Sequence, residues 1–539
     1  MRIWAILLLV SCAHAETHEH STPAAQAVKF DNLGTWSHKI SCKPEAQEWF
    51  DQGLRLVYGF NHDESIRSFS EAARVDPDCA MAYWGVAYAN GPHINNPMLD
   101  PDHAKAAWDA VQKAQAAKTA TPVEREWIAA VAKRYSADPK ADRGPLDQAY
   151  ADAMRELAKR HPDDSDAQTL FAESVMDLHP WEMWKNDGTA FEWTPEVVAA
   201  LEQALAKAPN NPGANHFYIH AIEESKQPDK ALGAADRLQT LEPGAGHLVH
   251  MPGHIYMRVG RYEDAAEANR KAIKVDDEYV KKQPAQAFYL MYKAHNFQFL
   301  WAAAMMEGRS AEAIQATRDM IATVPPPMME AMGDMLIIET STGFALARFG
   351  RWDEVLAQPA VSDKRRINSA LSHYLRGVAL ARKGKIEEAL KERDTVASAL
   401  AATDDKAMLG QSSAKSVLTI ADKMLAGEIA VAGKQMEEAI RLFEDAAKTE
   451  DTLHYDEPPD WLIPVRHTLG AVLLQAGHAK QAEKVYREDL ERNPNNGWSL
   501  YGLSEALRRQ GRKTEAAEAE QAFKKSWEHA DVKITSSRL

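Results

Sequence analysis

Apolar residues recur at helical spacing along the chain from Pro44 onward. In the stretch from Glu45 to Pro77, Phe69 and Ala72 stand at such a spacing, and Pro77 ends an alanine-rich amphipathic run. This spacing places apolar side chains on one face of an α-helix, and proline does not continue a helix. The pattern predicts an all-α protein built from consecutive amphipathic helices.

The same residue pattern returns in segments that begin at Gly260, Gly433, Gly477 and Gly511. It resembles the tetratricopeptide repeat, which has small residues where paired helices touch, an aromatic residue in the second helix and proline at the repeat end. The resemblance covers residues 45 to 528, at about twelve repeats. It implies an α-solenoid in which each repeat packs on its neighbours and the first helices line a concave groove.

Two segments, Asp78–Gly85 and His247–His254, are also similar to a group of exported bacterial repeat proteins. No Gly/Ser-rich linker interrupts residues 44–530, so we expect one continuous array, followed by a short tail at 531–539. Residues 16–43 are polar and mixed, and we expect them to form a flexible lead-in.

Residues 1–15 have the features of a signal peptide. Arg2 supplies a positive charge, Ile3–Val10 is a short apolar run, and Ala13-His14-Ala15 offers a cleavage site. The run Leu9–Cys12 also resembles a bacterial lipobox, which would make Cys12 a lipid-anchored N-terminus. Both interpretations predict export, either to the periplasm or as a membrane-anchored lipoprotein.

Export changes how the remaining cysteines are interpreted. Cys42 and Cys79 flank the first expected helical pair, and in an oxidising compartment they could form a disulfide. The alternative is two unrelated thiols. The sequence has no C-x-x-C pair, which argues against thiol redox work and c-type haem attachment.

The charge balance excludes one class of partner. The chain has 539 residues and a formal net charge of −15. Nucleic-acid binding needs a basic face to neutralise phosphates, and this sequence offers none. We therefore expect no nucleic-acid partner.

Histidines concentrate between residues 213 and 300. His216 and His220 lie one helical turn apart on one face, and Glu223 continues that stripe. The pair recurs as His250 and His254, 34 residues later, which is one helical-repeat period.

Two further histidines extend the group. His247 precedes the second pair by one turn, and His295 stands on the following expected first helix. Because proline is not tolerated deep inside a helix, Pro252 predicts a helix start near Val249–Met251, with His247 in the entry turn.

The family resemblance implies that these six histidines face the inner groove. Several convergent imidazoles and a carboxylate suit one or two zinc, iron or copper ions. We expect His216, His220, His250 and His254 to bind the metal, with Glu223, His247 and His295 as further ligands or supporting residues. The alternative is that the histidines are structural or contact a substrate.

The sequence leaves the activity open between two classes. A metal site could serve a hydrolase or an oxidoreductase, with Glu223 or Glu224 as general base and the aromatic-rich insertion His179–Trp193 covering it. The alternative is a scaffold whose groove binds a peptide or protein, where Arg466, His467, Trp498 and Tyr501 could contribute.

Overall fold

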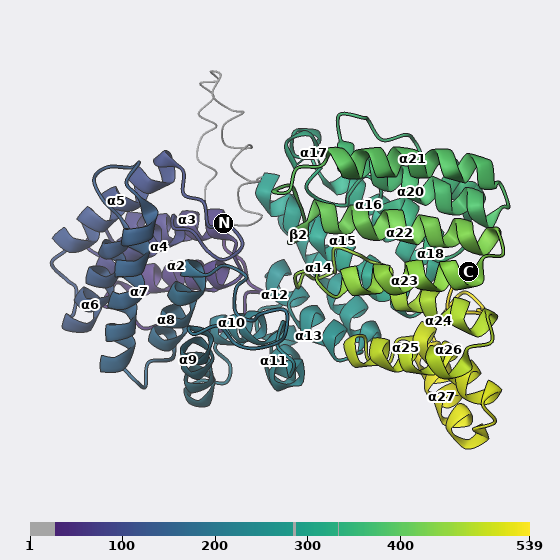
Figure 1. The fold of residues 1–539 in the computed structure, drawn as a ribbon. Helices are drawn as coiled ribbons and strands as arrows, with labels where there is room; N and C mark the ends of the chain where they lie inside the picture. Colours follow the sequence, from purple (N-terminus) through teal and green to yellow (C-terminus); the bar gives the residue numbers. More distant parts are fainter. Residues whose placement is uncertain (1–26, 284–286, 333) are drawn as a thin grey trace. The chain divides into compact units, whose positions relative to one another are not determined.

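The computed structural model describes residues 27–283, 287–332 and 334–539 (Figure 1). The expected signal peptide and the lipobox cysteine Cys12 lie outside the described residues. No described helix has both the length and the apolar character needed to cross a membrane.

The chain forms two compact units. The N-terminal unit contains the described residues up to Ile255 together with Lys271–Tyr289, and the C-terminal unit contains Tyr256–Arg270 and Leu290–Leu539. The sequence carries no linker signal for this division.

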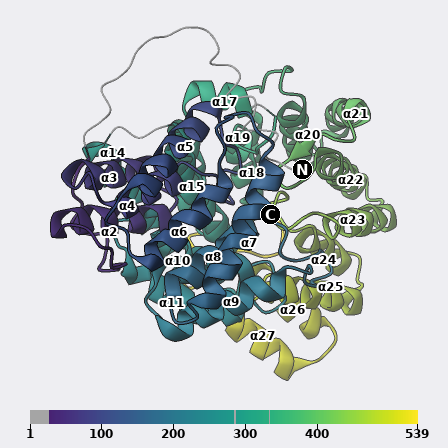
Figure 2. The same cartoon turned by 90° about the vertical axis from the view of Figure 1, so that its left-hand side faces the viewer.

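The N-terminal unit is built from consecutive helices that pack in pairs (Figure 2). Its helices are α2 (Pro44–Tyr58), α3 (His62–Val75), α4 (Ala80–Ala89), α5 (Pro101–Ala116), α6 (Pro122–Val131), α7 (Arg143–Arg160), α8 (Ser165–Leu178), α9 (Thr194–Lys207), α10 (Pro212–Ile222), α11 (Leu232–Leu241) and α12 (Gly246–His250), with short 3-10 turns at Ala132–Arg134 and Pro228–Ala231. The helices α13 (Pro252–Arg258) and α14 (Tyr262–Lys282) have residues in both units, and so does α15 (Ala287–Met306), whose first residues belong to the N-terminal unit.

The C-terminal unit repeats the same pairing, and Figure 1 shows α20 to α23 lying side by side. Its helices are α15 (Ala287–Met306), α16 (Ser310–Thr323), α17 (Pro326–Met332), α18 (Ser341–Arg348), α19 (Trp352–Leu356), α20 (Arg366–Arg382), α21 (Ile386–Ala402), α22 (Ala414–Ala432), α23 (Met436–Glu450), α24 (Val465–Gln475), α25 (Ala479–Arg492), α26 (Gly497–Arg509) and α27 (Lys513–Ser526). A small antiparallel pair, β1 (Met408–Leu409) and β2 (Ser412–Ser413), joins α21 to α22. The prediction of an all-α, solenoid-like fold is confirmed.

Glycines explain how the paired helices approach each other. Gly53 of α2 and Gly85 of α4 both face the buried ring of Phe69, and a Cβ atom at either position would overlap that ring. Gly470 and Gly502 likewise face the buried ring of Tyr486, which a Cβ atom at either position would overlap. Glycine costs about 1 kcal/mol relative to alanine inside a helix, and this close packing offsets the cost.

The N-terminal unit departs from a simple solenoid, in which each repeat contacts only its neighbours. The end of α2 packs against α10, because Gly213 leaves room for the ring of Tyr58. Gly59 faces Leu248 of α12 in the same way. The first helical pair therefore lies against helices more than 150 residues later in the chain, and the side chains between them are buried.

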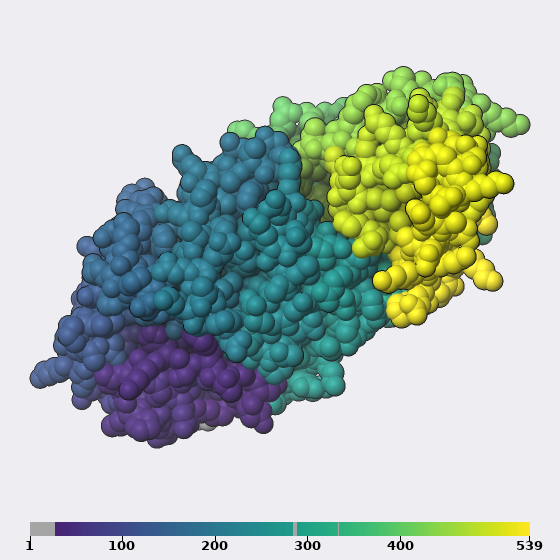
Figure 3. Space-filling model, turned by 90° about the horizontal axis from the view of Figure 1, so that it is seen from below, coloured from purple at the N-terminus to yellow at the C-terminus, as the bar shows by residue number. Residues whose placement is uncertain are grey.

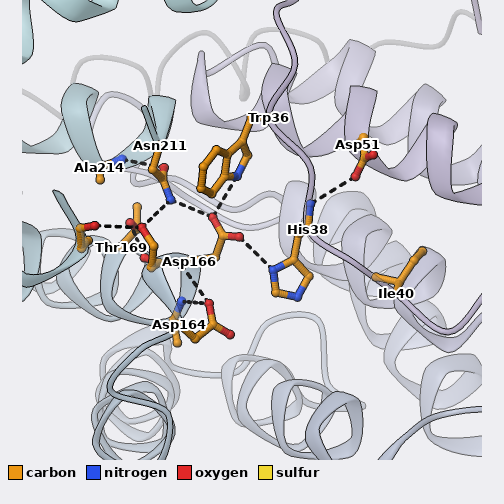
Figure 4. Close-up of polar contacts among 12 residues, drawn as sticks. Trp36, His38, Ile40, Asp51, Asp164, Asp166, Thr169, Asn211 and Ala214 are labelled. Atoms are coloured by element: carbon orange, nitrogen blue, oxygen red, sulfur yellow. Dashed lines mark hydrogen bonds and ion pairs between the residues drawn. The ribbon is translucent and has the colours of Figure 1, made fainter. Parts of the chain in front are cut away.

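The residues that we expected to form a flexible lead-in pack instead. In the N-terminal strap, residues 27–43, the indole Nε1 of Trp36 donates to Asp166 at 3.1 Å and Nδ1 of His38 lies 2.8 Å from the same carboxylate (Figure 4). Asn32 accepts from the backbone of Gly244 at 2.8 Å. The described part of the lead-in is ordered because its polar side chains pair with buried groups, and the N-terminal residues to which it belongs form the purple surface in Figure 3.

Two further connections stabilise the chain ends. Cys42, at the end of the strap, forms a disulfide with Cys79, and their Cα atoms are 5.2 Å apart. In the C-terminal unit, the hydroxyl of Ser537 is buried, lies 2.6 Å from the hydroxyl of Tyr486 and donates to the carbonyl of His467 at 2.7 Å. The expected tail at 531–539 is thus part of the packed structure.

Candidate metal centre

Helix α10 positions the first two histidines. Asn211 caps the helix by accepting from the backbone N–H of Ala214, and Pro212 occupies the first turn, where a missing N–H costs nothing. His216 and His220 then follow one turn apart, as expected, with their ring centroids 4.8 Å apart. Every residue of α10 is buried.

A backbone carbonyl of the first helical pair orients His216. Its Nδ1 lies 2.7 Å from the carbonyl oxygen of Tyr58, so this nitrogen carries the proton and donates. The lone pair is left on Nε2, which lies 3.2 Å from Nε2 of His247. The contact between α2 and α10 therefore sets the tautomer of this imidazole.

His220 is oriented by a carboxylate. Its Nδ1 lies 2.9 Å from Oε1 of Glu223 and donates to it. Its Nε2 is buried and has no hydrogen-bond partner among the residues that the structure describes. An unpaired nitrogen lone pair in a buried site costs free energy, and a metal ion could remove that cost.

The second set of histidines lies on two short helices. We expected His247 in an entry turn before a helix that starts near Val249–Met251, and this was wrong. Helix α12 already begins at Gly246 and includes His247 and His250, while Pro252 starts the separate helix α13. Proline at the first position of a new helix avoids the steric clash that it would cause inside one.

Three of the six histidines converge in the N-terminal unit. One ring nitrogen each of His216, His220 and His247 lies within 4.8 Å of the other two, and all three side chains are buried. The sequence favoured a set in which His216 and His220 joined His250 and His254. In the structure His247 joins the first pair, and His250 and His254 form a pair of their own with Nε2 atoms 2.9 Å apart.

Glu223 connects the two groups. Its Oε1 accepts from Nδ1 of His220, and its Oε2 lies 2.6 Å from Nδ1 of His254. Burial alone would raise the pKa of Glu223, but the two neighbouring imidazoles outweigh burial and hold the pKa below its usual range. Both oxygens thus face imidazoles, as in carboxylates that orient histidine ligands of a metal. The expected role of Glu223 as a ligand stays a prediction.

The imidazoles are held in the neutral form that binds metals. Burial lowers the pKa of His216 and His247 well below the usual value, and the neighbouring imidazoles lower it further. Burial also lowers the pKa of His220, although Glu223 opposes this effect. Metal binding therefore requires no protonated imidazole to lose a charge at neutral pH.

Residues of the first two helical pairs also surround the three histidines, and the sequence did not predict them. The ring of Phe60 lies 4.6 Å from that of His216 and 5.2 Å from that of His247. Phe60 also stacks on His93, with ring centroids 4.3 Å apart, and His93 in turn lies 4.3 Å from His62. The sequence marks this region by the glycine and prolines of Gly91–Pro97, which break the second repeat.

The aromatic insertion His179–Trp193 covers this region, as we expected. Trp181 packs edge-on against His220, with ring centroids 5.3 Å apart. The indole of Trp184 donates to the carbonyl of Ala221 at 2.8 Å, and its backbone N–H donates to Glu224 at 3.3 Å. Glu224 therefore holds the insertion in place.

The remaining candidate residues belong to the C-terminal unit. His295 belongs to α15 in the C-terminal unit, where its Nδ1 lies 3.1 Å from Oε1 of Gln298, and its role as a ligand stays a prediction. The groove candidates His467 and Trp498 are fully buried, and Arg466 pairs with Asp451 through two hydrogen bonds of 2.8 Å.

Comparison with known proteins identifies the repeats. Models of the tetratricopeptide repeat match residues 249–279 and 467–530. The first of these segments contains His250 and His254. No curated protein sequence matches the chain.

Solved structures resemble the chain only distantly. The APC/C hetero-tetramer Cut9-Hcn1 is 14% identical, with 89% of this chain and 76% of that chain covered and a TM-score of 0.30. Yeast Tom70 is 13% identical, with coverages of 90% and 92% and a TM-score of 0.30, and a monomeric mutant of IFIT1 is 12% identical, with coverages of 90% and 96% and a TM-score of 0.35. These low scores carry no argument about function. The chain therefore contains tetratricopeptide repeats at these two segments, within a longer array of paired helices.

Proposed function

We propose that the N-terminal unit binds a transition-metal ion between His216, His220 and His247. The observation that carries this proposal is the convergence of one nitrogen from each ring within 4.8 Å. Ligands that are each about 2.0–2.1 Å from one ion must lie within about 4 Å of one another, so a small side-chain movement completes the site.

The protein prepares this site before any ion arrives. Hydrogen bonds from Nδ1 fix the rings of His216 and His220, and burial keeps all three imidazoles neutral. Outer hydrogen bonds of this kind orient metal-binding histidines and raise their basicity. In a purely structural cluster, His220 would keep a buried nitrogen with no partner.

The donor set narrows the choice of metal. Three imidazoles without a directly bound carboxylate suit copper or zinc, whereas non-haem iron sites combine two histidines with a carboxylate. A bound ion would supply Lewis-acid or redox chemistry. We propose metal binding and assign no reaction, because Glu223 is engaged by two imidazoles and Glu224 by Trp184.

Elemental analysis tests this proposal. Protein purified without a histidine tag should contain close to stoichiometric copper or zinc, or should take up either metal on dialysis. A His216→Gln/His247→Gln variant should lose the ion held by these rings and contain about one equivalent less metal than the wild type, whereas the control His103→Gln, which changes an exposed histidine of α5, should match the wild type. Metal-free wild-type protein that takes up no copper, zinc or iron would overturn the proposal.

We also propose that the protein is exported. The features of residues 1–15 and the disulfide between Cys42 and Cys79 support this, since disulfides persist in oxidising compartments. Mass spectrometry of the mature N-terminus tests it. A start near residue 16 supports cleavage, a lipid-modified Cys12 supports the anchored form, and an intact Met1 in the cytoplasm contradicts both.

The repeat family suggests protein binding as a second candidate function. However, the N-terminal inner-face histidines and the C-terminal groove candidates His467 and Trp498 are buried. A peptide in the groove could not reach these residues. The described residues therefore favour a metal centre over a peptide-binding site built from these side chains.

A further inference from the structure

We propose that His250 and His254 bind a second metal ion beside the first, so that the centre is dinuclear. This inference rests on the proposed function, because the second ion completes the same histidine cluster. It goes further by assigning separate ligands and a shared supporting carboxylate to a second ion.

The distance between the two rings fits a shared ion. Their Nε2 atoms lie 2.9 Å apart, and both side chains are buried. Two nitrogens at this separation, each about 2.0–2.1 Å from an ion, subtend an angle of about 90° at the ion, which is within the range of metal geometries. The rings are also nearly perpendicular, at 83°. An ion would displace the proton that the two Nε2 atoms share, and once His250 carries its proton on Nδ1 both lone pairs can converge on the ion from different directions.

Glu223 sets the tautomer of His254. At 2.6 Å between Nδ1 and Oε2, a proton must lie between the two atoms, because two lone pairs repel at that distance. The other nitrogen, Nε2, therefore presents its lone pair toward His250. Glu223 does the same for His220 with its other oxygen, so one carboxylate orients a ligand of each ion.

The two ligand sets are adjacent. The ring centroids of His220 and His254 lie 5.7 Å apart, and those of His247 and His250 also lie 5.7 Å apart. The buried negative charge of Glu223 would offset part of the charge of both ions. Sites of this kind hold two ions about 3.5–4 Å apart and can clamp one small oxygen ligand between them.

Titration with cobalt(II) counts the ions. Cobalt bound by histidine absorbs visible light, and metal-free wild-type protein should reach a plateau at two equivalents. The variant His250→Gln/His254→Gln should reach a plateau at one equivalent, as should His216→Gln/His247→Gln. A wild-type plateau at one equivalent would overturn the second site and leave the proposed function intact, whereas no binding would overturn both.

Copper(II) gives a readout that does not depend on a variant folding correctly. Two adjacent copper(II) ions couple magnetically, so the wild-type EPR signal per bound copper should fall as loading rises from one equivalent to two. A signal that stays proportional to bound copper would show that the ions are not neighbours and would overturn the proposal. Circular dichroism before titration confirms that each variant retains its helices.

Discussion

Nε2 of His216 and Nε2 of His247 lie 3.2 Å apart, although 31 residues separate them in the chain. The repeat brings α10 and α12 side by side, and the carbonyl of Tyr58, from the first helical pair, turns His216 toward His247. The approach of these two nitrogens thus depends on a contact between distant parts of the N-terminal unit. The metal centre and the folding of that unit should therefore be linked.

Replacing Glu223 tests this arrangement without removing a ligand. Glu223→Gln removes the charge that orients His220 and His254. Loss of such outer hydrogen-bond partners weakens metal binding by about 10–100-fold. Competition against a coloured chelator should show this loss for both bound ions.

The matched control is Glu224→Gln. Glu224 accepts from the backbone of Trp184, so its replacement should leave metal affinity nearly unchanged. Equal losses in the two variants would indicate a general disturbance of this segment. An unchanged affinity in Glu223→Gln would show that the carboxylate does not support the centre.

The helices could be predicted from the sequence because their signals are local. A glycine and an aromatic residue spaced like Gly53 and Phe69 indicate a helix pair wherever this spacing recurs in the chain. The packing of Tyr58 against Gly213 could not be predicted, because no local pattern reports a contact across that length of chain. The packing of the strap could not be predicted for a related reason. The ring nitrogens of Trp36 and His38 bind Asp166, a buried residue far along the chain, and no local pattern reports this contact.

The sequence could predict which histidines belong to the candidate site better than it could predict which of them lie together. The spacing of His216 and His220 places both on one face of a helix whatever the tertiary structure is. The partner of that pair depends on the helix break at Pro252, which leaves His247 and His254 on different short helices. Phe60 and His93 reach the site from the first two helical pairs, and only tertiary structure brings them there.

His38 should make stability depend on pH. Burial alone would lower its pKa, but its hydrogen bond to Asp166 and the charge of that carboxylate outweigh burial and raise the pKa to about 9, from 6.5. Asp166 also accepts from Tyr58 at 2.7 Å and from Asn211 at 2.9 Å, so it stays fixed (Figure 4). Because the folded state holds the proton more tightly, this stability is fully present below about pH 6.5 and is lost as pH rises through about 9.

The measurement compares urea unfolding of the wild type and His38→Gln at about pH 6 and about pH 10. The wild type should lose about 1–3 kcal/mol more than the variant between these conditions. His103→Gln serves as control because His103 is exposed and outside this cluster. A wild type and a His38→Gln variant with parallel pH profiles would contradict the assigned role of the ion pair.

The close contact between α4 and α3 predicts that Gly85→Ala destabilises the protein. Alanine would normally favour the helix by about 1 kcal/mol. Here its Cβ would overlap the buried ring of Phe69, and overpacking of this kind costs about 1–3 kcal/mol. Thermal denaturation should show a lower midpoint for Gly85→Ala than for the control Gly233→Ala, where the position is exposed. A midpoint equal to or above that of the wild type would show that the ring moves aside without cost.

The disulfide between Cys42 and Cys79 should stabilise the first helical pair and the strap together. It closes a loop across 37 residues, and closing a loop of that length in the unfolded chain stabilises a protein by about 2–4 kcal/mol. Just before Cys42, the backbone N–H of Ser41 donates to Glu124 at 2.6 Å, so the bond also fixes the strap against α6. Reducing agent should therefore lower the unfolding midpoint of the wild type and leave that of Cys42→Ser/Cys79→Ser unchanged. If both proteins respond equally to reducing agent, or neither does, the two cysteines are not paired in the native protein.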